Sequence, residues 1–143
     1  MDKYDSLKLE NQLCFPLYAA SREIVKLYYP YLTKLGITYT QYITLMVMWD
    51  AKSISSKELG KKLFLDSGTL TPLLKELEKK GFVTRTRSKD DERNLIVDIT
   101  DAGMALRDQA LEVPMMVSGC ISLPPDEAVT LYKTLYKILD ELK

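Results

Sequence analysis

An apolar helical repeat that changes abruptly into a strand repeat constrains this chain more than any other feature. Residues 66–81 carry leucines at the spacing of a single helix face, namely Leu70, Leu73, Leu74 and Leu77. Asp66 can cap the first turn of this helix, and Gly81 can end it in the left-handed conformation. Pro72 removes a hydrogen bond from the second turn, which predicts either a bend there or a second helix start at Thr71.

The repeat has a period of two after Gly81. Residues 82–87 and 94–99 both alternate between apolar and polar side chains, and the polar loop 88–93 separates them. Two alternating runs joined by a short polar loop predict a β-hairpin that follows helix 66–81 directly.

Two further helices are predicted upstream of helix 66–81. Residues 38–49 are apolar nearly all round, which indicates a buried helix. Ser55 and Glu58 have capping-box spacing and begin a short helix over residues 55–63. A short helix, a turn, a second helix and a hairpin together predict a winged helix-turn-helix, a mainly α fold with a small β-hairpin wing.

The outward face of helix 66–81 carries short hydrogen-bond donors first and long cations afterwards: Ser67, Thr69, Thr71, Lys75 and Lys79. This order suits a helix whose N-terminal end enters the major groove of DNA. For this helix alone, a solvated amphipathic helix is an equal alternative, and both lysines are equally explained as phosphate contacts or as solvated charges. The charge distribution favours DNA, because residues 52–93 hold eleven Lys or Arg against seven Asp or Glu in a chain of zero net charge.

Helices with apolar stripes flank this centre. A first helix is predicted from about residue 8 to residue 29, bent by Pro16 near Cys14 and ended or kinked at Pro30. A fifth helix begins at Asp101, is interrupted at Pro114 and reaches about Cys120, and a last helix follows the break at residues 123–126.

These stripes predict a homodimer, because a winged helix of some fifty residues cannot cover them. We therefore expect a dimerisation and sensor helix in 1–35, a DNA-binding domain in 36–100 and dimerisation helices in 101–143. Such a dimer presents two helices to a pseudo-palindromic stretch of double-stranded DNA.

Composition disfavours an enzyme. The chain has no histidine, and Cys14 and Cys120 form no Cys-x-x-Cys pair. Histidine-dependent catalysis, most zinc sites and thioredoxin-like chemistry are therefore excluded, and we expect neither a metal nor a cofactor. The polar N-terminus has no apolar signal core, and no apolar run reaches membrane-spanning length, which predicts a cytoplasmic protein.

Several segments resemble a known family. Residues 91–103 are similar to the wing signature of MarR-type transcriptional regulators, an Asp-x-Arg followed by a strand and Leu/Ile-Thr-x-x-Gly. Residues 9–22, 37–42 and 65–72 resemble a narrower group, the organic hydroperoxide resistance regulators (OhrR type), which sense peroxide through an N-terminal cysteine. The resemblance extends from about residue 8 to the last helix and is most specific before residue 104.

The resemblance implies roles for individual residues. The peroxide-reactive cysteine matches Cys14, and the tyrosines that hydrogen-bond its sulfur match Tyr28 and Tyr39. The wing arginine that enters the minor groove matches Arg93, and the acidic residue that steadies the wing matches Asp91. Without the resemblance, Cys14 reads equally well as a small buried apolar residue, and Arg93 as a solvated charge.

Helix geometry limits how these residues can meet. Tyr18 is four residues from Cys14 and can lie beside it. Tyr28 is fourteen residues away, roughly 21 Å along a straight helix. If the family's contacts hold, Tyr28 and Tyr39 must reach Cys14 from the partner subunit.

Cys120 leaves three outcomes for an oxidised Cys14. The sulfenic acid can form a disulfide with Cys120 of the other subunit, or condense with a low-molecular-weight thiol, in which case Cys120 is only a small apolar residue, or persist as such. The sequence does not set the distance between the two sulfurs, which a disulfide requires to be short.

The predicted function is a sequence-specific DNA-binding repressor that senses organic hydroperoxide or a related oxidant through Cys14 and leaves its operator on oxidation. The alternative is a MarR-type repressor released by a small phenolic or aromatic ligand between the dimer arms and the winged domain. A thiol-dependent peroxidase is a third reading, which the absence of a cation near Cys14 in the sequence disfavours.

Overall fold

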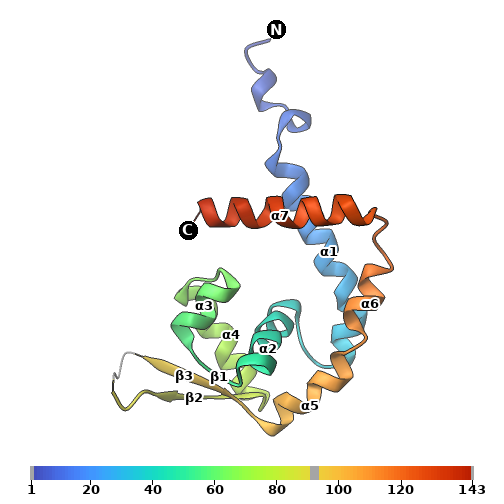
Figure 1. Ribbon diagram of the computed structural model, residues 1–143. Coiled ribbons are helices and arrows are strands. Elements are labelled where there is room, and N and C mark those ends of the chain that lie inside the picture. The colour runs from blue at the N-terminus through green and yellow to red at the C-terminus, as the bar shows by residue number, and fades with distance from the viewer. Residues whose placement is uncertain (1, 91–93, 143) are drawn as a thin grey trace. The chain divides into compact units, whose positions relative to one another are not determined.

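The computed structural model describes residues 2–90 and 94–142, and it is mainly helical with a small antiparallel sheet (Figure 1). The chain forms two compact units, Met1–Val113 and Pro114–Lys143, and each is described by itself. Asp91 and Arg93, to which the sequence assigns roles in the wing, lie outside the described residues.

The first unit begins with two short 3-10 helices and continues through five α-helices and three strands within the described residues. In chain order these are η1 (Asp5–Leu7), η2 (Leu9–Asn11), α1 (Cys14–Lys34), α2 (Tyr39–Ala51), β1 (Ser53–Ser55), α3 (Ser56–Leu63), α4 (Ser67–Lys79), β2 (Val83–Arg87), β3 (Leu95–Ile99) and α5 (Asp101–Ala110). A winged helix-turn-helix, as predicted, occupies α2 to β3.

Helix α1 differs from its prediction at both ends. It begins at Cys14, so Pro16 lies in the first turn, where its missing N–H costs no hydrogen bond, and the bend expected from a proline deep in the helix is not required. It does not end at residue 29 but continues through Pro30 to Lys34. Leu32, which is 2% exposed, packs the last turn into the core, and this burial offsets the hydrogen bond that Pro30 removes.

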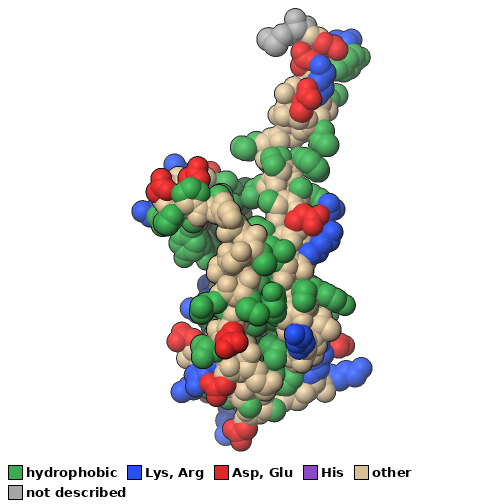
Figure 2. All heavy atoms as spheres, turned by 90° about the vertical axis from the view of Figure 1, so that its right-hand side faces the viewer, with side chains coloured by type: hydrophobic (Ala, Val, Ile, Leu, Met, Phe, Trp, Pro, Cys, Tyr) green, Lys and Arg blue, Asp and Glu red, His purple; other side chains and the backbone are tan. Residues whose placement is uncertain are grey.

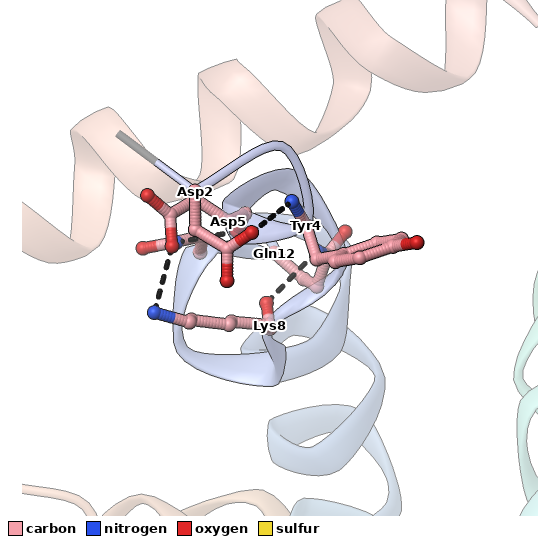
Figure 3. A network of polar contacts seen from close by, with 6 residues as sticks. Asp2, Tyr4, Asp5, Lys8 and Gln12 are labelled. Atoms are coloured by element: carbon pink, nitrogen blue, oxygen red, sulfur yellow. Dashed lines mark hydrogen bonds and ion pairs between the residues drawn. The ribbon is translucent and has the colours of Figure 1, made fainter.

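The segment before α1 is held by its own polar groups, several of which Figure 3 shows. Gln12 Nε2 donates to the backbone oxygens of Ser6 and Lys8 at 2.6 and 2.9 Å, and Lys8 Nζ lies 2.7 Å from Asp5 Oδ1. Hydrophobic side chains stand at the surface of this segment and of α1 (Figure 2).

Helices α3 and α4 form the helix-turn-helix. Ser55 Oγ accepts a hydrogen bond from Glu58 N, and Asp66 Oδ1 accepts one from Thr69 N at 2.8 Å, so both helices are capped as predicted. Helix α4 starts at Ser67, which excludes the alternative start at Thr71. The predicted apolar face is confirmed, because its leucines are all buried: Leu70, Leu73, Leu74 and Leu77.

The hairpin is confirmed, and a third strand joins it. Strands β2 and β3 pair antiparallel with Arg85 opposite Val97, and β1 pairs with the other edge of β3. Strand β1 was not predicted because three residues are too few to show an alternating pattern. Val83 and Val97 are buried and attach the base of the hairpin to the core.

A close contact at Gly103 joins the hairpin to α5. Thr100 caps α5 by accepting from Gly103 N at 3.0 Å, and its own hydroxyl donates to Gly81 O at 2.6 Å. The Gly103 carbonyl accepts from Trp49 Nε1 on α2 at 2.9 Å. A side chain at position 103 would collide with the Phe82 carbonyl, so this joint requires glycine.

The fifth predicted helix is divided into α5 and α6 (Val113–Ser118), with the interruption at residues 111–112 rather than at Pro114. In the second unit, the predicted last helix is confirmed as α7 (Pro125–Glu141). None of its described residues is buried. In the described chain, no helix is both long and apolar enough to span a membrane.

Replacement of Gly103 by alanine is expected to lower the free energy of unfolding by about 1–3 kcal/mol, because the new methyl group overpacks the joint. Urea denaturation at a fixed protein concentration measures this change. Gly68→Ala is the matched control, since a Cβ there lies 3.4 Å from Asp66 Oδ1, an ordinary contact. Equal stability of the two variants would contradict the proposed role of the joint.

Candidate nucleic-acid interface and redox site

Helix α4 presents a polar face to solvent directly opposite its leucines. The side chains predicted to face DNA are all exposed on it: Ser67, Thr69, Thr71, Lys75 and Lys79. The structure thus brings the short donors together at the N-terminal end of α4 and the cations toward its C-terminal end. Such a face can bind phosphates and base edges, because Ser, Thr and Lys side chains all carry hydrogen-bond donors.

Helix α3 adds cations that the sequence analysis counted but did not single out. Lys57, Lys61 and Lys62 are exposed on this helix. A side chain at Gly60 would lie 2.9 Å from the Leu65 backbone oxygen, so glycine allows the turn to pass close to α3. The three lysines of α3 could have been predicted as candidate DNA contacts, because they lie on the first helix of the helix-turn-helix, directly before α4.

The hairpin is tied to α4 by Glu78 and Arg85. The Glu78 carboxylate accepts from Arg85 Nη2 at 3.1 Å and from the Arg85 backbone N–H at 3.0 Å. The side-chain hydrogen bond from Arg85 lowers the pKa of Glu78 below its usual value, so the carboxylate is charged at neutral pH. This pair was not predicted from the sequence, because the two residues belong to elements with different periodicities.

Cys14 is exposed and is the first residue of α1. Tyr18 lies one turn further along α1 and is also exposed, and the Arg22 guanidinium carbon lies 5.3 Å from the centroid of its ring. The N-terminal end of α1 therefore combines an accessible thiol with exposed apolar and aromatic groups.

Tyr28 and Tyr39, assigned to the same site by resemblance, lie together in this chain. Their ring centroids are 4.8 Å apart, and Tyr42 joins them at 5.7 Å from Tyr28. Burial raises the pKa of Tyr39, and the neighbouring Tyr28 raises it further; burial is also the main cause of the raised pKa of Tyr42. The Tyr39 and Tyr42 hydroxyls therefore keep their protons at neutral pH and can act as hydrogen-bond donors.

The tyrosine cluster and Cys14 of the same chain are far apart. Cys14 and Tyr28 both lie in the continuous helix α1, at a separation of fourteen residues, or roughly 21 Å along the axis. A tyrosine hydroxyl cannot span that distance. A contact between this cluster and a Cys14 sulfur therefore requires a second copy of the chain.

A cavity of about 380 Å³ lies beside the tyrosine cluster. It is lined by Val25, Tyr29, Leu32, Thr33, Gly36, Ile37, Thr38, Tyr39 and Lys80. Lys80 Nζ donates to Gly36 O at 2.8 Å and to Gln41 Oε1 at 2.7 Å, and these bonds fix the end of α4 to the α1–α2 corner. The role of Lys80 could not be predicted from the sequence, because its partners lie 39 and 44 residues away along the chain.

Cys120 belongs to the second unit and is exposed. Its thiol donates to the backbone oxygen of Met116 at 3.5 Å. Over residues 2–90 and 94–142, the structure contains no group of three or more Cys, Asp or Glu side chains that could hold a metal ion.

Comparisons with known proteins place the chain in a family. A family model described as transcriptional regulator SarA/Rot matches residues 26–110, more than half of the chain. The organic hydroperoxide resistance transcriptional regulator of Bacillus subtilis is 44% identical over 141 residues, covering 99% of this chain and 96% of the relative.

Solved structures show the same relationship. Reduced AbfR bound to DNA is 38% identical with a TM-score of 0.80, covering 99% of this chain and 98% of AbfR, a protein of Staphylococcus epidermidis. Disulfide-formed AbfR is 36% identical with a TM-score of 0.66 and 96% coverage of each chain. A mutant MarR of E. coli complexed with operator DNA is 28% identical with a TM-score of 0.77, covering 97% of this chain and 99% of MarR.

The chain therefore belongs to the MarR-type and SarA/Rot transcriptional regulators, and the resemblance to the organic hydroperoxide resistance group is confirmed. The proteins it is similar to are transcriptional regulators, and the winged-helix fold is the one they share.

The raised pKa of Tyr39 predicts a late step in alkaline titration. Folding raises this pKa, so Tyr39 contributes to the free energy of unfolding only while its hydroxyl is protonated. That contribution is complete below a pH of about 10 and is lost as the pH rises through the pKa that Tyr39 has in the folded protein. Ultraviolet absorbance of tyrosinate should show a component that ionises above the ordinary tyrosine pKa of about 10, and Tyr39→Phe should reduce this component.

The matched control is Tyr29→Phe, which removes an exposed hydroxyl group one residue after Tyr28 in the sequence and should leave the late component in place. Titration of all tyrosines of the wild type as a single group near pH 10 would show that the cluster is not buried as described.

Proposed function

We propose that this protein is a homodimeric repressor that binds a pseudo-palindromic operator and releases it when organic hydroperoxide or a related oxidant reacts at Cys14. The observation that carries the proposal is the position of the thiol. Cys14 is exposed at one end of α1, while the tyrosines that suit it as donors lie near the other end. In the proposed dimer, Cys14 of each chain lies beside the tyrosines of the other chain.

DNA binding is assigned to the polar face of α4 and to the wing. Ser67, Thr69 and Thr71 would meet base edges or phosphates, and Lys75 and Lys79 would contact phosphates. Arg93 would enter the minor groove, with Asp91 steadying the loop, as the family match implies. The exposure of the α4 residues and the DNA-bound state of reduced AbfR support this assignment.

Release begins with attack of the Cys14 thiolate on the peroxide. The sulfur takes one oxygen and becomes a sulfenic acid, while the second oxygen leaves as the alcohol and takes a proton. A cysteine without help is only a few per cent ionised at neutral pH, so hydroxyl donors at the sulfur increase the reactive fraction. Tyr28 and Tyr39 of the partner subunit supply those donors, and Tyr18 of the same chain lies one turn away.

The sulfenic acid then reacts with Cys120 of the other subunit. The Cys120 sulfur displaces the sulfenic oxygen, which leaves as water, and a disulfide joins the two chains. The exposure of both cysteines and the existence of a disulfide form of AbfR support this route. A low-molecular-weight thiol in place of Cys120 would give a mixed disulfide on a single chain.

A second candidate function is supported by the cavity beside Tyr39. A phenolic or aromatic anion could lie against Tyr29 and Tyr39, with the Lys80 ammonium close to its charge. Binding there would act directly on the corner that Lys80 connects to the end of α4. Under either mechanism, we propose a cytoplasmic regulator with no enzymatic turnover of its own, no cofactor and no membrane association.

Operator release separates these candidates. The operator is first selected from random duplexes by the reduced protein, and its binding is then measured during titration with cumene hydroperoxide, hydrogen peroxide or salicylate. We expect organic hydroperoxide to release the wild type at the lowest concentration and to leave Cys14→Ser bound. Release of Cys14→Ser by peroxide, or of the wild type by salicylate alone, would contradict oxidation as the signal.

Non-reducing electrophoresis of the same samples shows which disulfide the oxidised Cys14 forms. A disulfide between subunits predicts a covalent dimer in the wild type that both Cys14→Ser and Cys120→Ser abolish. A dimer band that survives in Cys120→Ser excludes that bond, and monomer only in the released wild type indicates a small thiol instead.

A further inference from the structure

An acidic side chain on the DNA-facing helix needs an explanation, because it repels phosphate. Helix α4 carries two such residues, Glu76 and Glu78. Glu76 is exposed, whereas Glu78 accepts two hydrogen bonds from Arg85 on strand β2. The two carboxylates therefore differ in contacts although they lie on the same helix, two residues apart.

The contact between Glu78 and Arg85 lies where the hairpin leaves the core. Val83 is buried and Arg85 pairs with the buried Val97, but Thr86 and Arg87 further along β2 are exposed. A small rotation of β2 at this level moves everything beyond it through a larger distance, since strands rise about 3.3 Å per residue.

The geometry of the contact between Glu78 and Arg85 can fix the direction of strand β2 relative to helix α4. Glu78 holds both the backbone N–H and the guanidinium of the same residue, so the strand is fixed in position and in rotation. Arg85 is mostly buried, and its Nε has no hydrogen-bond partner among the residues that the structure describes, which leaves Glu78 as its described anionic contact. Glu78 itself is partly exposed, and ion pairs of that kind contribute little to folding.

We propose that Glu78 is a positioning residue for operator binding, which fixes the direction in which the β2–β3 hairpin leaves helix α4. The inference rests on the proposed function, because the wing and α4 must reach the operator together. Fixing the angle between them before binding reduces the conformational entropy lost on the DNA, at the cost of a negative charge near phosphates.

Two opposing effects make the proposal testable. Glu78→Gln removes a negative charge from the DNA-binding face, and by charge alone it should tighten every DNA complex. It also removes the charge-assisted bonds to Arg85, and by loss of positioning it should weaken the operator complex about two- to fivefold. Glu76→Gln is the matched control, because it makes the same charge change on α4 without affecting Arg85.

Affinities for the selected operator and for a scrambled duplex of equal length are measured for the wild type and both variants in the reduced state. We expect Glu76→Gln to bind both duplexes as tightly as the wild type or more tightly. We expect Glu78→Gln to lose operator affinity while its affinity for the scrambled duplex does not fall. A loss confined to the operator is not what unfolding or simple charge change produces.

Charge exchange gives a second measurement. The single variant Glu78→Arg gains positive charge but faces Arg85 with a like charge, whereas Glu78→Arg with Arg85→Glu restores an ion pair. We expect the double variant to bind the operator more tightly than the single variant, despite its lower positive charge.

The outcomes distinguish the two levels of the proposal. A wild type with no preference for any selected duplex contradicts the proposed function. A wild type that prefers its operator, with Glu78→Gln and Glu76→Gln shifting operator affinity equally, overturns the positioning role alone. An operator affinity of the single exchange variant at or above that of the double variant also overturns it.

Discussion

Burial of the leucine face of α4 is the constraint on which the rest of the structure depends. Its leucines pack in a core with Leu45 and Met48 of α2, Leu59 of α3, and Val83 and Val97 of the sheet, all of them buried. Each fully buried leucine contributes about 1.5–3 kcal/mol, so this face decides the orientation of α4. With one face fixed in the core, the opposite face and its donors must point to solvent.

Much of the fold could be predicted because local signals and core packing agree. The caps at Ser55 and Asp66, the leucines and the alternating strands all specify the same elements that the structure contains. Predictions failed where tertiary packing overrides a local signal. Leu32 carries α1 past Pro30, and β1 forms only because β3 offers it an edge.

The candidate site could be predicted only as a set of residue types. The family resemblance assigned Tyr28 and Tyr39 to one site, and in the structure the two rings are in contact. The exposed face of α4 could be predicted from the helical spacing of its leucines. The contacts of Lys80 and Glu78 depend on how separate elements pack, which a sequence pattern does not encode. Asp91 and Arg93 are known from the family signature alone, and their roles are still predictions.

The central claim is that each sensor site is built from two chains, since helix α1 separates Cys14 from Tyr28. Mixed dimers test it most directly. One chain carries Cys14→Ser with its tyrosines intact, the other carries Tyr28→Phe and Tyr39→Phe with its cysteine intact, and different tags allow the mixed dimer to be isolated. If the site forms between chains, the remaining cysteine should react with organic hydroperoxide at the wild-type rate. A rate as slow as that of the dimer lacking all four tyrosines would contradict the account.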